Sequence, residues 1–460
     1  GGSAIFTVKT GLWHCCLMNS NLNHKKIAVI GLGISNISVI RYLMLHDLGV
    51  LSIFDTRYNP PHMGDLPLGV DLKLGPLDAG VLKQYDMVVI SPGISIYDEV
   101  ISQVIAAGVE VVGDVELFAR EVKAPVIGIT GSNGKSTVTS LTGYMAHGAE
   151  IKVAVGGNIG VPVFDILSDD VELYVLELSS FQLETTRSLK LEACTILNVS
   201  EDHLDRYHGN IEEYTKVKQR IFLNAKNVIV NRDDPRTYPP KEDRQKYNII
   251  SFGSDNSGNY GLDCDKKVTY LTHNRIRSVS SENIGIYGKH NYLNALACMA
   301  LTECVGINLK SQTKSLEKFS GLPHRCQLVK AIRNVCYYND SKATNVASAE
   351  AAIAGLKSMH PKGIILLAGG LGKGQDFSPL KKYIGNEVKK VFCFGQDRQK
   401  LLDISPLCES VDTMEQGLRK AYEIAAEGQA VLLSPACASF DQFKGFEHRG
   451  QVFEELVGKL

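Results

Sequence analysis

The sequence lacks the features that mark several protein classes. None of its eleven cysteines forms a C-x-x-C pair, so a zinc site is not expected, and the scattered thiols predict a reducing cytoplasm. No apolar run approaches the ~20 residues of a membrane span. The net charge is −1 with no long basic run, which argues against nucleic acid or a membrane surface as a partner.

Length and the order of apolar segments predict an α/β protein of three domains. The 460 residues allow about three domains at roughly 150 residues each, and no internal repeat is present. We expect a Rossmann-like domain over 18–114, a central P-loop ATPase-like domain with a mostly parallel sheet over 115–320, and a second Rossmann-like domain over 321–460. Residues 1–17 read as a non-native extension, because Gly1-Gly2-Ser3 resembles a cloning remnant.

Residues 127–138 predict the site around which the chain is organised. They read I-G-I-T-G-S-N-G-K-S-T-V, an apolar strand followed by a loop that opens a helix. Glycines let backbone N–H groups approach an anion, a helix N-terminus favours negative charge, and a lysine and a hydroxyl suit phosphate and Mg²⁺. Ile129 stands where the usual P-loop has its first glycine, so an ordinary strand–turn–helix junction is the alternative. We predict a nucleoside triphosphate site formed by Gly131, Ser132, Asn133, Gly134, Lys135, Ser136 and Thr137.

The start of the chain has a βαβ pattern. It predicts a helix over 34–48 and strands over 26–30, 51–54 and 87–90. Ligands collect at the carboxyl ends of such strands, where G-L-G-I-S-N, Asp55-Thr56-Arg57 and Ser91-Pro92-Gly93 stand. Asn36 replaces the third glycine of the dinucleotide fingerprint, so another nucleotide is favoured over the redox cofactor of a dehydrogenase. Arg57 suits a phosphate-bearing ligand.

Three side chains of the central region are candidates for metal chemistry. Glu177 ends an otherwise apolar strand, so it is either a ligand of Mg²⁺ or a capped or salt-bridged carboxylate. His203, in E-D-H-L-D-R-Y, is either a metal ligand or a structural histidine. Lys218 lies on a predicted helix, where the residue pattern indicates a solvated lysine. The other expected elements are strands over 126–130, 151–155, 174–178 and 194–199 and a helix over 292–304, with a turn-rich stretch over 232–285.

The third region alternates strands with helices in another doubly wound pattern. After the first strand, the turn 339–345 either places Thr344 or Asn345 as a helix cap, or makes an anion or ribose site with Asp340 and Lys342. Two more small-residue turns, 369–374 and 434–440, also follow apolar strands. The expected strands are 335–338, 364–367, 391–394 and 430–433.

Together these motifs resemble the Mur ligase family, the ATP-dependent amide-bond ligases of peptidoglycan precursor synthesis. The most specific strings are L-E-L-S-S-F-Q-L-E-T-T, Y-N-D-S-K-A-T-N and L-S-P-A-C-A-S-F-D-Q-F, while the phosphate loop is family-wide and does not choose the substrate. The resemblance covers essentially residue 25 to the end. It implies a monomer that adds D-glutamate to UDP-N-acetylmuramoyl-L-alanine through an acyl phosphate, with ATP and two Mg²⁺ ions.

The resemblance also implies a role for each motif. Lys218 would be carbamylated (N6-carboxylysine), which reverses its solvated interpretation. The catalytic set would be Lys135, Glu177, His203, Lys218, Arg325 and Lys342, and the metal ligands Ser136, Glu177, His203 and carbamylated Lys218. The substrate nucleotide would meet Gly33, Ile34, Ser35, Asp55, Thr56, Arg57, Gly93 and Asn158. ATP would meet residues 131–137 with Asn291, Asn294, Arg325 and Asp340, and D-glutamate would meet Lys342, Thr344, Lys373, Ser439 and Phe446.

Two departures from the family pattern stand out. Leu371 occupies a position where an acidic residue is expected, and Ser136 replaces a threonine but keeps the hydroxyl. The rival interpretations are a family member that adds another amino acid or extends folate with glutamate, and a nucleotide-binding regulator or scaffold without turnover.

Overall fold

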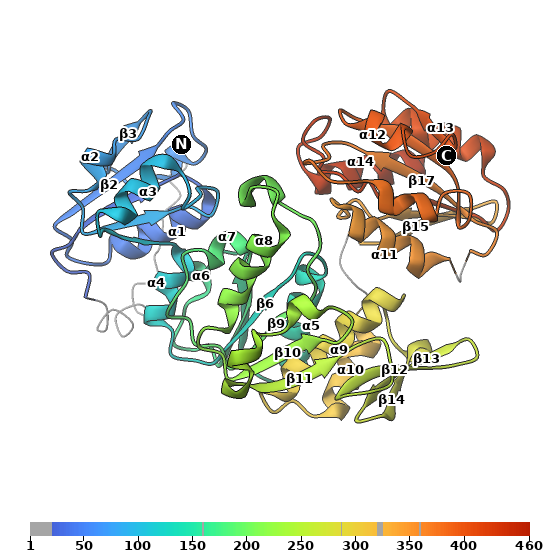
Figure 1. The fold of residues 1–460 in the computed structure, drawn as a ribbon, viewed down its shortest axis with the longest axis horizontal. Helices are drawn as coiled ribbons and strands as arrows, with labels where there is room; N and C mark the ends of the chain where they lie inside the picture. Colours follow the sequence, from blue (N-terminus) through green and yellow to red (C-terminus); the bar gives the residue numbers. More distant parts are fainter. Residues whose placement is uncertain (1–20, 159–160, 287, 320–324, 358–359) are drawn as a thin grey trace, which may run out of the picture.

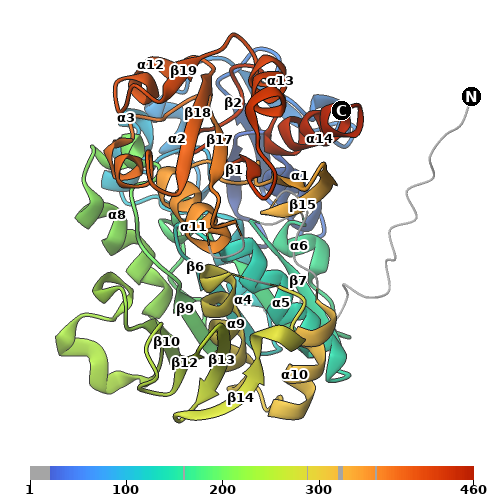
Figure 2. The same ribbon diagram turned by 90° about the vertical axis from the view of Figure 1, so that its right-hand side faces the viewer.

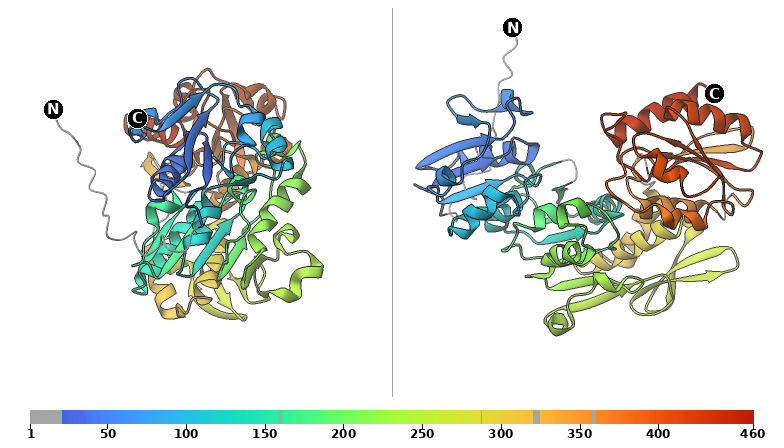
Figure 3. Two further views of the ribbon diagram at one scale, coloured as in Figure 1. Left: turned by 90° about the vertical axis from the view of Figure 1, so that its left-hand side faces the viewer. Right: turned by 45° about the horizontal axis from the view of Figure 1, so that its top comes forward.

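The computed structural model describes residues 21–158, 161–286, 288–319, 325–357 and 360–460. Each of three sheets organises one α/β domain, and the two outer domains lie on the same side of the central one (Figure 1; Figure 3). The sheets occupy residues 26–112, 126–280 and 327–433, which confirms the three-domain α/β prediction. The predicted boundaries stay a prediction, and residues 1–17 and 321–324 lie outside the described residues. No described helix combines the length and apolarity needed to cross a bilayer.

The first domain is a parallel sheet in the order β3-β2-β1-β4-β5. The apolar strands β1 and β4 lie at its centre because they are buried on both faces. Helices cover the faces, and Asp98 caps α3 by accepting from two backbone N–H groups. The elements are β1 (Lys26–Ile30), α1 (Ile34–Leu43), β2 (Val50–Asp55), β3 (Asp71–Leu74), α2 (Ala79–Leu82), β4 (Met87–Ile90), α3 (Glu99–Ala106), β5 (Glu110–Val112) and α4 (Asp114–Glu121).

The central sheet has the order β14-β13-β12-β11-β10-β9-β6-β8-β7. It is parallel from β7 to β12, and the turn-rich stretch adds the antiparallel β13 and β14 at one edge. Its strands are β6 (Val126–Thr130), β7 (Val153–Gly157), β8 (Leu173–Glu177), β9 (Ala193–Ile196), β10 (Asn227–Asn231), β11 (Asn248–Phe252), β12 (Tyr260–Asp265), β13 (Val268–His273) and β14 (Ile276–Ser280). Its helices are α5 (Lys135–Gly148), α6 (Val163–Ile166), α7 (Ser180–Leu183), α8 (Ile211–Lys218), α9 (Lys289–Glu303) and α10 (Leu309–Lys318).

The C-terminal domain has the sheet order β15-β16-β20-β17-β18-β19, in which only the β15–β16 pair is antiparallel. Its helix α11 packs on α9 of the central domain, and Figure 2 shows it directly above that domain. The elements are β15 (Gln327–Ile332), β16 (Val335–Asn339), α11 (Val346–Leu356), β17 (Ile364–Gly369), β18 (Val388–Phe394), α12 (Arg398–Leu402), β19 (Cys408–Ser410), α13 (Met414–Ile424), β20 (Ala430–Leu433) and α14 (Phe446–Gly458).

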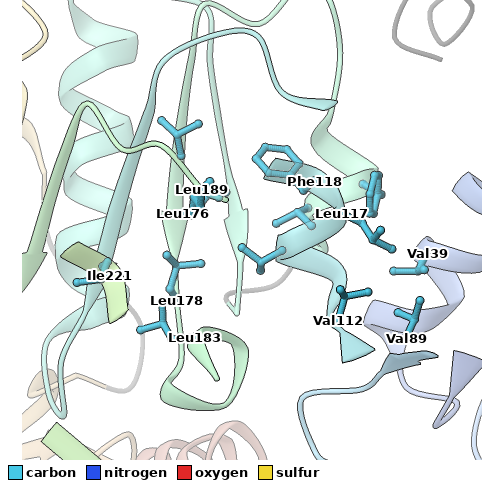
Figure 4. Packing of buried hydrophobic residues seen from close by; sticks show 14 of the residues in the cluster. Val39, Val89, Val112, Leu117, Phe118, Leu176, Leu178, Leu183, Leu189 and Ile221 are labelled. Atoms are coloured by element: carbon cyan, nitrogen blue, oxygen red, sulfur yellow. The ribbon is translucent and has the colours of Figure 1, made fainter. Parts of the chain in front are cut away.

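One hydrophobic core joins the first domain to the central domain. Val89 and Val112 from the first sheet pack in the same buried cluster as Phe118 of α4 and Leu176 and Leu178 of the central domain (Figure 4). Apolar burial of this kind stabilises by roughly 25 cal/mol per Å². The first domain is therefore fixed to the central one through α4.

Some predicted limits were wrong. The helix predicted over 34–48 ends at Leu43, because the chain turns back and the Gly49 N–H donates to Lys25 O at the start of β2. The strand predicted over 151–155 begins two residues later, at Val153. The edge strands β3, β5, β15 and β19 were not predicted, since short or half-exposed edge strands carry a weak apolar signal.

Candidate active site

The phosphate loop has the predicted strand–loop–helix form. The strand β6 lies between β8 and β9, so the loop leaves the middle of the sheet. Gly134 has φ +83 and Lys135 begins α5 directly after it. The Asn133 N–H donates to Asn198 Oδ1 at 2.9 Å, and Lys135 Nζ donates to Gly131 O at 2.8 Å. The turn after β9 thus fixes the phosphate loop, and the Lys135 side chain folds back over the loop.

Glu177 and Ser136 meet beside this loop. Glu177 ends β8, the strand next to β6, and it is 3% exposed. Ser136 Oγ donates to Glu177 Oε2 at 3.0 Å, and Asn158 Nδ2 donates to Oε1 at 3.3 Å. Among the described residues no group of three or more His, Cys, Asp or Glu side chains could hold a metal. One carboxylate, one hydroxyl and nearby phosphate is a donor set that fits Mg²⁺.

Lys218 is buried, so the solvated interpretation from its local pattern was wrong. It is 1% exposed because its side chain reaches from the end of α8 to Thr130 and Gly131 at the start of the phosphate loop. Lys218 Nζ donates to Gly131 O at 3.1 Å and lies 4.6 Å from the centre of the Tyr214 ring. Burial, and then the charge of Lys135, lower the pKa of Lys218 well below its usual value. This shift favours the neutral amine, which is the nucleophilic form of lysine.

Asp202 and His203 approach the site from the other side. Lys373 Nζ of the C-terminal domain donates to Asp202 Oδ1 at 3.1 Å, and His203 Nε2 lies 3.6 Å from Oδ2. Burial raises the pKa of Asp202, but the charges of His203, Lys373 and Lys135 outweigh it and the net pKa is lowered. Burial lowers the pKa of His203, which favours the neutral imidazole that a metal requires.

Asn345 connects the helix cap to the phosphate loop. Its side chain caps α11 by accepting from the Ser348 N–H, as one of the two sequence alternatives proposed. Its Nδ2 donates to Asn133 Oδ1 at 2.9 Å, and Ser348 Oγ also donates to that oxygen. The residue that caps α11 therefore also contacts the phosphate loop, and α11 lies against that loop through Asn345 and Ser348.

A cavity of about 230 Å³ lies between the phosphate loop and α11. The pKa of Asp340 is raised to about 7 by burial, although Ser434 Oγ donates to it at 2.8 Å. Arg325 Nε and His290 Nδ1 are buried without a partner in the described part of the chain, so both have unused capacity for a ligand. The cavity is lined by Asn133, Gly134, Asn291, Asn294, Arg325 and Asp340 from the predicted set, and by His290, Ser348 and Phe252, which were not predicted.

A second cavity, of about 180 Å³, adjoins the first. Its lining includes residues predicted to bind ATP, the substrate nucleotide and D-glutamate. Lys342 Nζ lies 4.1 Å from the centre of the Phe446 ring. Burial, then the charge of Arg325, lower the pKa of Lys342 to about 8. The lining includes Lys135, Ser136, Asn158, Glu177, His203, Arg325, Lys342 and Thr344. Ser439 lines neither cavity.

The departure at Leu371 does not disturb the local backbone. Leu371 and Ala438 exchange backbone hydrogen bonds, each 2.9 Å long, which joins the turn of Lys373 to the turn of Ser439. The pairing uses main-chain atoms and so does not depend on the side chain at this position.

The predicted residues of the first domain lie where β1, β2 and β4 end side by side. Arg57 is turned back on Asp55, with Nη2–Oδ2 at 2.8 Å, and this hydrogen bond lowers the pKa of Asp55 to about 2. Asp55 also accepts from the Leu32 N–H at 2.8 Å, which fixes the glycine turn. Arg206 of the central domain donates to Pro92 O at 2.6 Å and so reaches the loop of Gly93.

Comparison with known proteins follows the same three-domain division. The Mur ligase MurD-like N-terminal domain matches residues 25–113, the Mur ligase middle domain matches 129–302, and the Mur ligase glutamate ligase domain matches 324–437. The chain belongs to the Mur ligase family. Two relatives named UDP-N-acetylmuramoylalanine–D-glutamate ligase, from Escherichia coli (strain K12) and Vibrio campbellii, are each 45% identical over 438 residues, covering 95% of this chain and 98% of the relative.

Solved Mur ligase structures have the same fold. UDP-N-acetylmuramate-alanine ligase MurC from Thermotoga maritima superposes with a TM-score of 0.59 at 18% identity, over 95% of this chain and 100% of that one. A pseudomurein peptide ligase type C from Methanothermus fervidus gives 0.60 at 18% identity, over 95% and 99%. The three-domain Mur ligase fold is thereby confirmed.

Proposed function

We propose that this Mur ligase joins D-glutamate to UDP-N-acetylmuramoyl-L-alanine, using ATP, in the synthesis of peptidoglycan precursors. The observation that carries the proposal is the 45% identity, over 95% of the chain, to relatives named for that reaction. The meeting of the phosphate loop with Lys342, Thr344 and Lys373 supports it, because an acyl phosphate and an amine must meet at one place.

The chemistry divides into two steps. ATP transfers its terminal phosphoryl group to the L-alanine carboxylate and leaves as ADP. The neutral amine of D-glutamate then attacks the acyl phosphate, displaces phosphate, loses a proton and gives the amide. The first step depends on charge neutralisation and positioning. Lys135 and the N-terminus of α5 bind the transferred phosphate, and Arg325, with its unused Nε, meets the same charge. Lys342 and Lys373 orient the two carboxylates of D-glutamate.

Mg²⁺ supplies further neutralisation when it is bound. Ser136 and Glu177 are the proposed ligands of one ion, and His203 with carbamylated Lys218 those of a second. Support for carbamylation comes from the burial of Lys218 and its lowered pKa, since only the neutral amine adds to carbon dioxide. The resulting carbamate would be an anion buried beside Lys135, which compensates the charge that now destabilises the pair.

The substrate nucleotide, the amino acid and ATP have separate proposed binding sites. We place the uridine diphosphate end at Gly33, Ile34, Ser35, Asp55, Thr56, Arg57 and Gly93, with Asn158 between that end and Glu177. Asn291, Asn294 and Asp340 contact the ATP nucleoside, and Ser439 and Phe446 complete the D-glutamate site. We also propose a monomer in the cytoplasm, which suits the free thiols of the described cysteines.

The decisive assay is phosphate release from ATP with UDP-N-acetylmuramoyl-L-alanine and a set of amino acids. Release that requires D-glutamate, and does not occur with L-glutamate, L-lysine or meso-diaminopimelate, supports the proposal. Release with another amino acid moves the enzyme within the family. Lys135→Ala should abolish turnover in a folded chain, because it removes the charge that neutralises the transferred phosphate at the N-terminus of α5; near-normal activity would refute the assignment.

A further inference from the structure

The turn that carries Lys342 is far along the chain from Ser439 and Phe446, but all three meet at one buried arginine. Arg449 lies in the first turns of α14 and is 0% exposed. Its Nε donates to Ser341 Oγ at 2.9 Å, its Nη2 to Ser341 O at 2.7 Å, and its Nη1 to Cys437 O at 3.0 Å. One guanidinium therefore contacts Ser341, which precedes Lys342, and Cys437, which lies two residues before Ser439. Arg449 itself lies about one helical turn after Phe446.

Further hydrogen bonds join the segments around Arg449 to one another. Ser341 Oγ in turn donates to Phe446 O at 2.7 Å, and Asn339 Nδ2 donates to Gly450 O at 3.3 Å and to Glu454 Oε1 at 3.1 Å. The start of α14 is thereby fixed to the turn after β16. This turn also places Lys342 against the ring of Phe446.

Burying an arginine in a domain core costs free energy, because its charge loses contact with water. Within the described residues, the three side-chain hydrogen bonds of Arg449 go to carbonyl or hydroxyl oxygens, and none goes to a carboxylate. Burial lowers the pKa of Arg449 to about 10. Asp441 and Asp340 act on Arg449 only through space, without a hydrogen bond. A buried charge that no carboxylate contacts directly destabilises a fold, and an apolar side chain would fill the same space without that penalty. The planar fork of arginine can, however, bind two separate loops at fixed angles, as no apolar side chain can.

We propose that Arg449 is a positioning residue for the amino-acid substrate, holding the loops of Lys342 and Ser439 and the start of α14 in one arrangement. The inference rests on the proposed function, which puts D-glutamate at these side chains. Arg449 donates no hydrogen bond to the phosphate loop or to Asp340, whose carboxylate is held by Ser434 and the Cys326 N–H, so its effect should be larger at the D-glutamate site than at the ATP site. Loss of the fork should weaken the use of D-glutamate much more than the use of ATP.

The test compares Arg449→Met and Arg449→Lys with a matched control, Arg398→Met. Arg398 also donates to a backbone carbonyl of this domain, Val411 O at 2.6 Å, but contacts neither loop. The full-length enzyme is assayed by phosphate release, with KM for D-glutamate and for ATP measured separately, and the melting temperature of each variant is recorded. We expect the methionine variant to raise KM for D-glutamate about tenfold or more, since three bonds from a charged donor are lost, with KM for ATP changed by less than about twofold.

The lysine variant keeps the charge but not the fork, so its KM for D-glutamate should fall between wild type and the methionine variant. Arg398→Met should leave both KM values at wild-type levels. Unchanged KM for D-glutamate in either folded Arg449 variant, an equal rise in both KM values, or failure of both variants to fold would overturn the inference. A wild-type enzyme without D-glutamate-dependent phosphate release would instead refute the proposed function.

Discussion

Gly157 holds the backbone at the position that decides where Glu177 lies. It ends β7 opposite Glu177 of β8, with φ +103. A Cβ at this position would lie 2.3 Å from Glu177 O, whereas real Cβ contacts stay above 3.0 Å, so the strands would separate by at least 0.7 Å. The neighbouring atom is backbone and cannot rotate away. Gly157→Ala should therefore displace the candidate Mg²⁺ ligand without removing any functional group.

The size of the effect follows from that displacement. A misplacement of about 1 Å at a reacting centre costs up to roughly 10²-fold in rate. We expect kcat for phosphate release to fall by roughly 10- to 100-fold and the Mg²⁺ concentration for half-maximal rate to rise by about tenfold. The positive φ adds a stability penalty of roughly 1–2 kcal/mol for any residue with a side chain.

Gly209→Ala separates the two effects. Gly209 has φ +71, and a Cβ there would meet nothing within 4 Å. It should lose comparable stability but keep the wild-type Mg²⁺ requirement. The assay is a Mg²⁺ titration of phosphate release, with thermal melting of each variant. Equal loss of activity in both variants, or a wild-type Mg²⁺ response in folded Gly157→Ala, would refute the reasoning.

Three further predictions follow. KM for D-glutamate should rise above pH 8, because Lys342, with its pKa lowered to about 8, is a cation below that pH and loses the charge above it; Lys342→Arg should remove the dependence, and a flat wild-type profile to pH 9.5 would contradict it. Asp202→Asn should lower the pKa of His203 further, since the carboxylate raises it, and an NMR titration that finds it unchanged would count against the geometry. Asn345→Ala should lower stability by about 1 kcal/mol through the lost cap and raise KM for ATP about fivefold. Thr413→Ala, which removes the cap of α13 alone, should show only the stability loss, and a similar KM in both variants would be the contrary result.

The parts of the site that could be predicted are those built from neighbouring residues. The phosphate loop can be predicted because strand, glycines, lysine and hydroxyl follow one another in the sequence. Glu177 can be predicted because a carboxylate ends an apolar strand. The residue pattern also offered His203 and Lys342 as candidates, and the family resemblance assigned their roles. Both lie beside the loop in the structure.

The remaining parts depend on contacts across long stretches of chain. Lys218 has the local pattern of a solvated helix, and only the tertiary contacts of its side chain with Thr130 and Gly131 show that it is buried. Asn133 and Asn345 are hydrogen-bonded across 212 positions, which no local pattern records. Arg449 reads as a surface residue in the charged run K-G-F-E-H-R-G, yet it is fully buried. Strand order poses the same problem, since β6 pairs with β8 and β9 rather than with β7.

The hydrogen bonds from α11 to Asn133 have a consequence for the order of events in a catalytic cycle. One wall of the nucleotide cavity belongs to the C-terminal domain, through Ser348 and its neighbours on α11. Spent ADP must then leave by the same movement that withdraws Lys342 and Lys373 from the loop. We therefore expect the exit of ADP and the release of the new amide to depend on the same movement of the C-terminal domain.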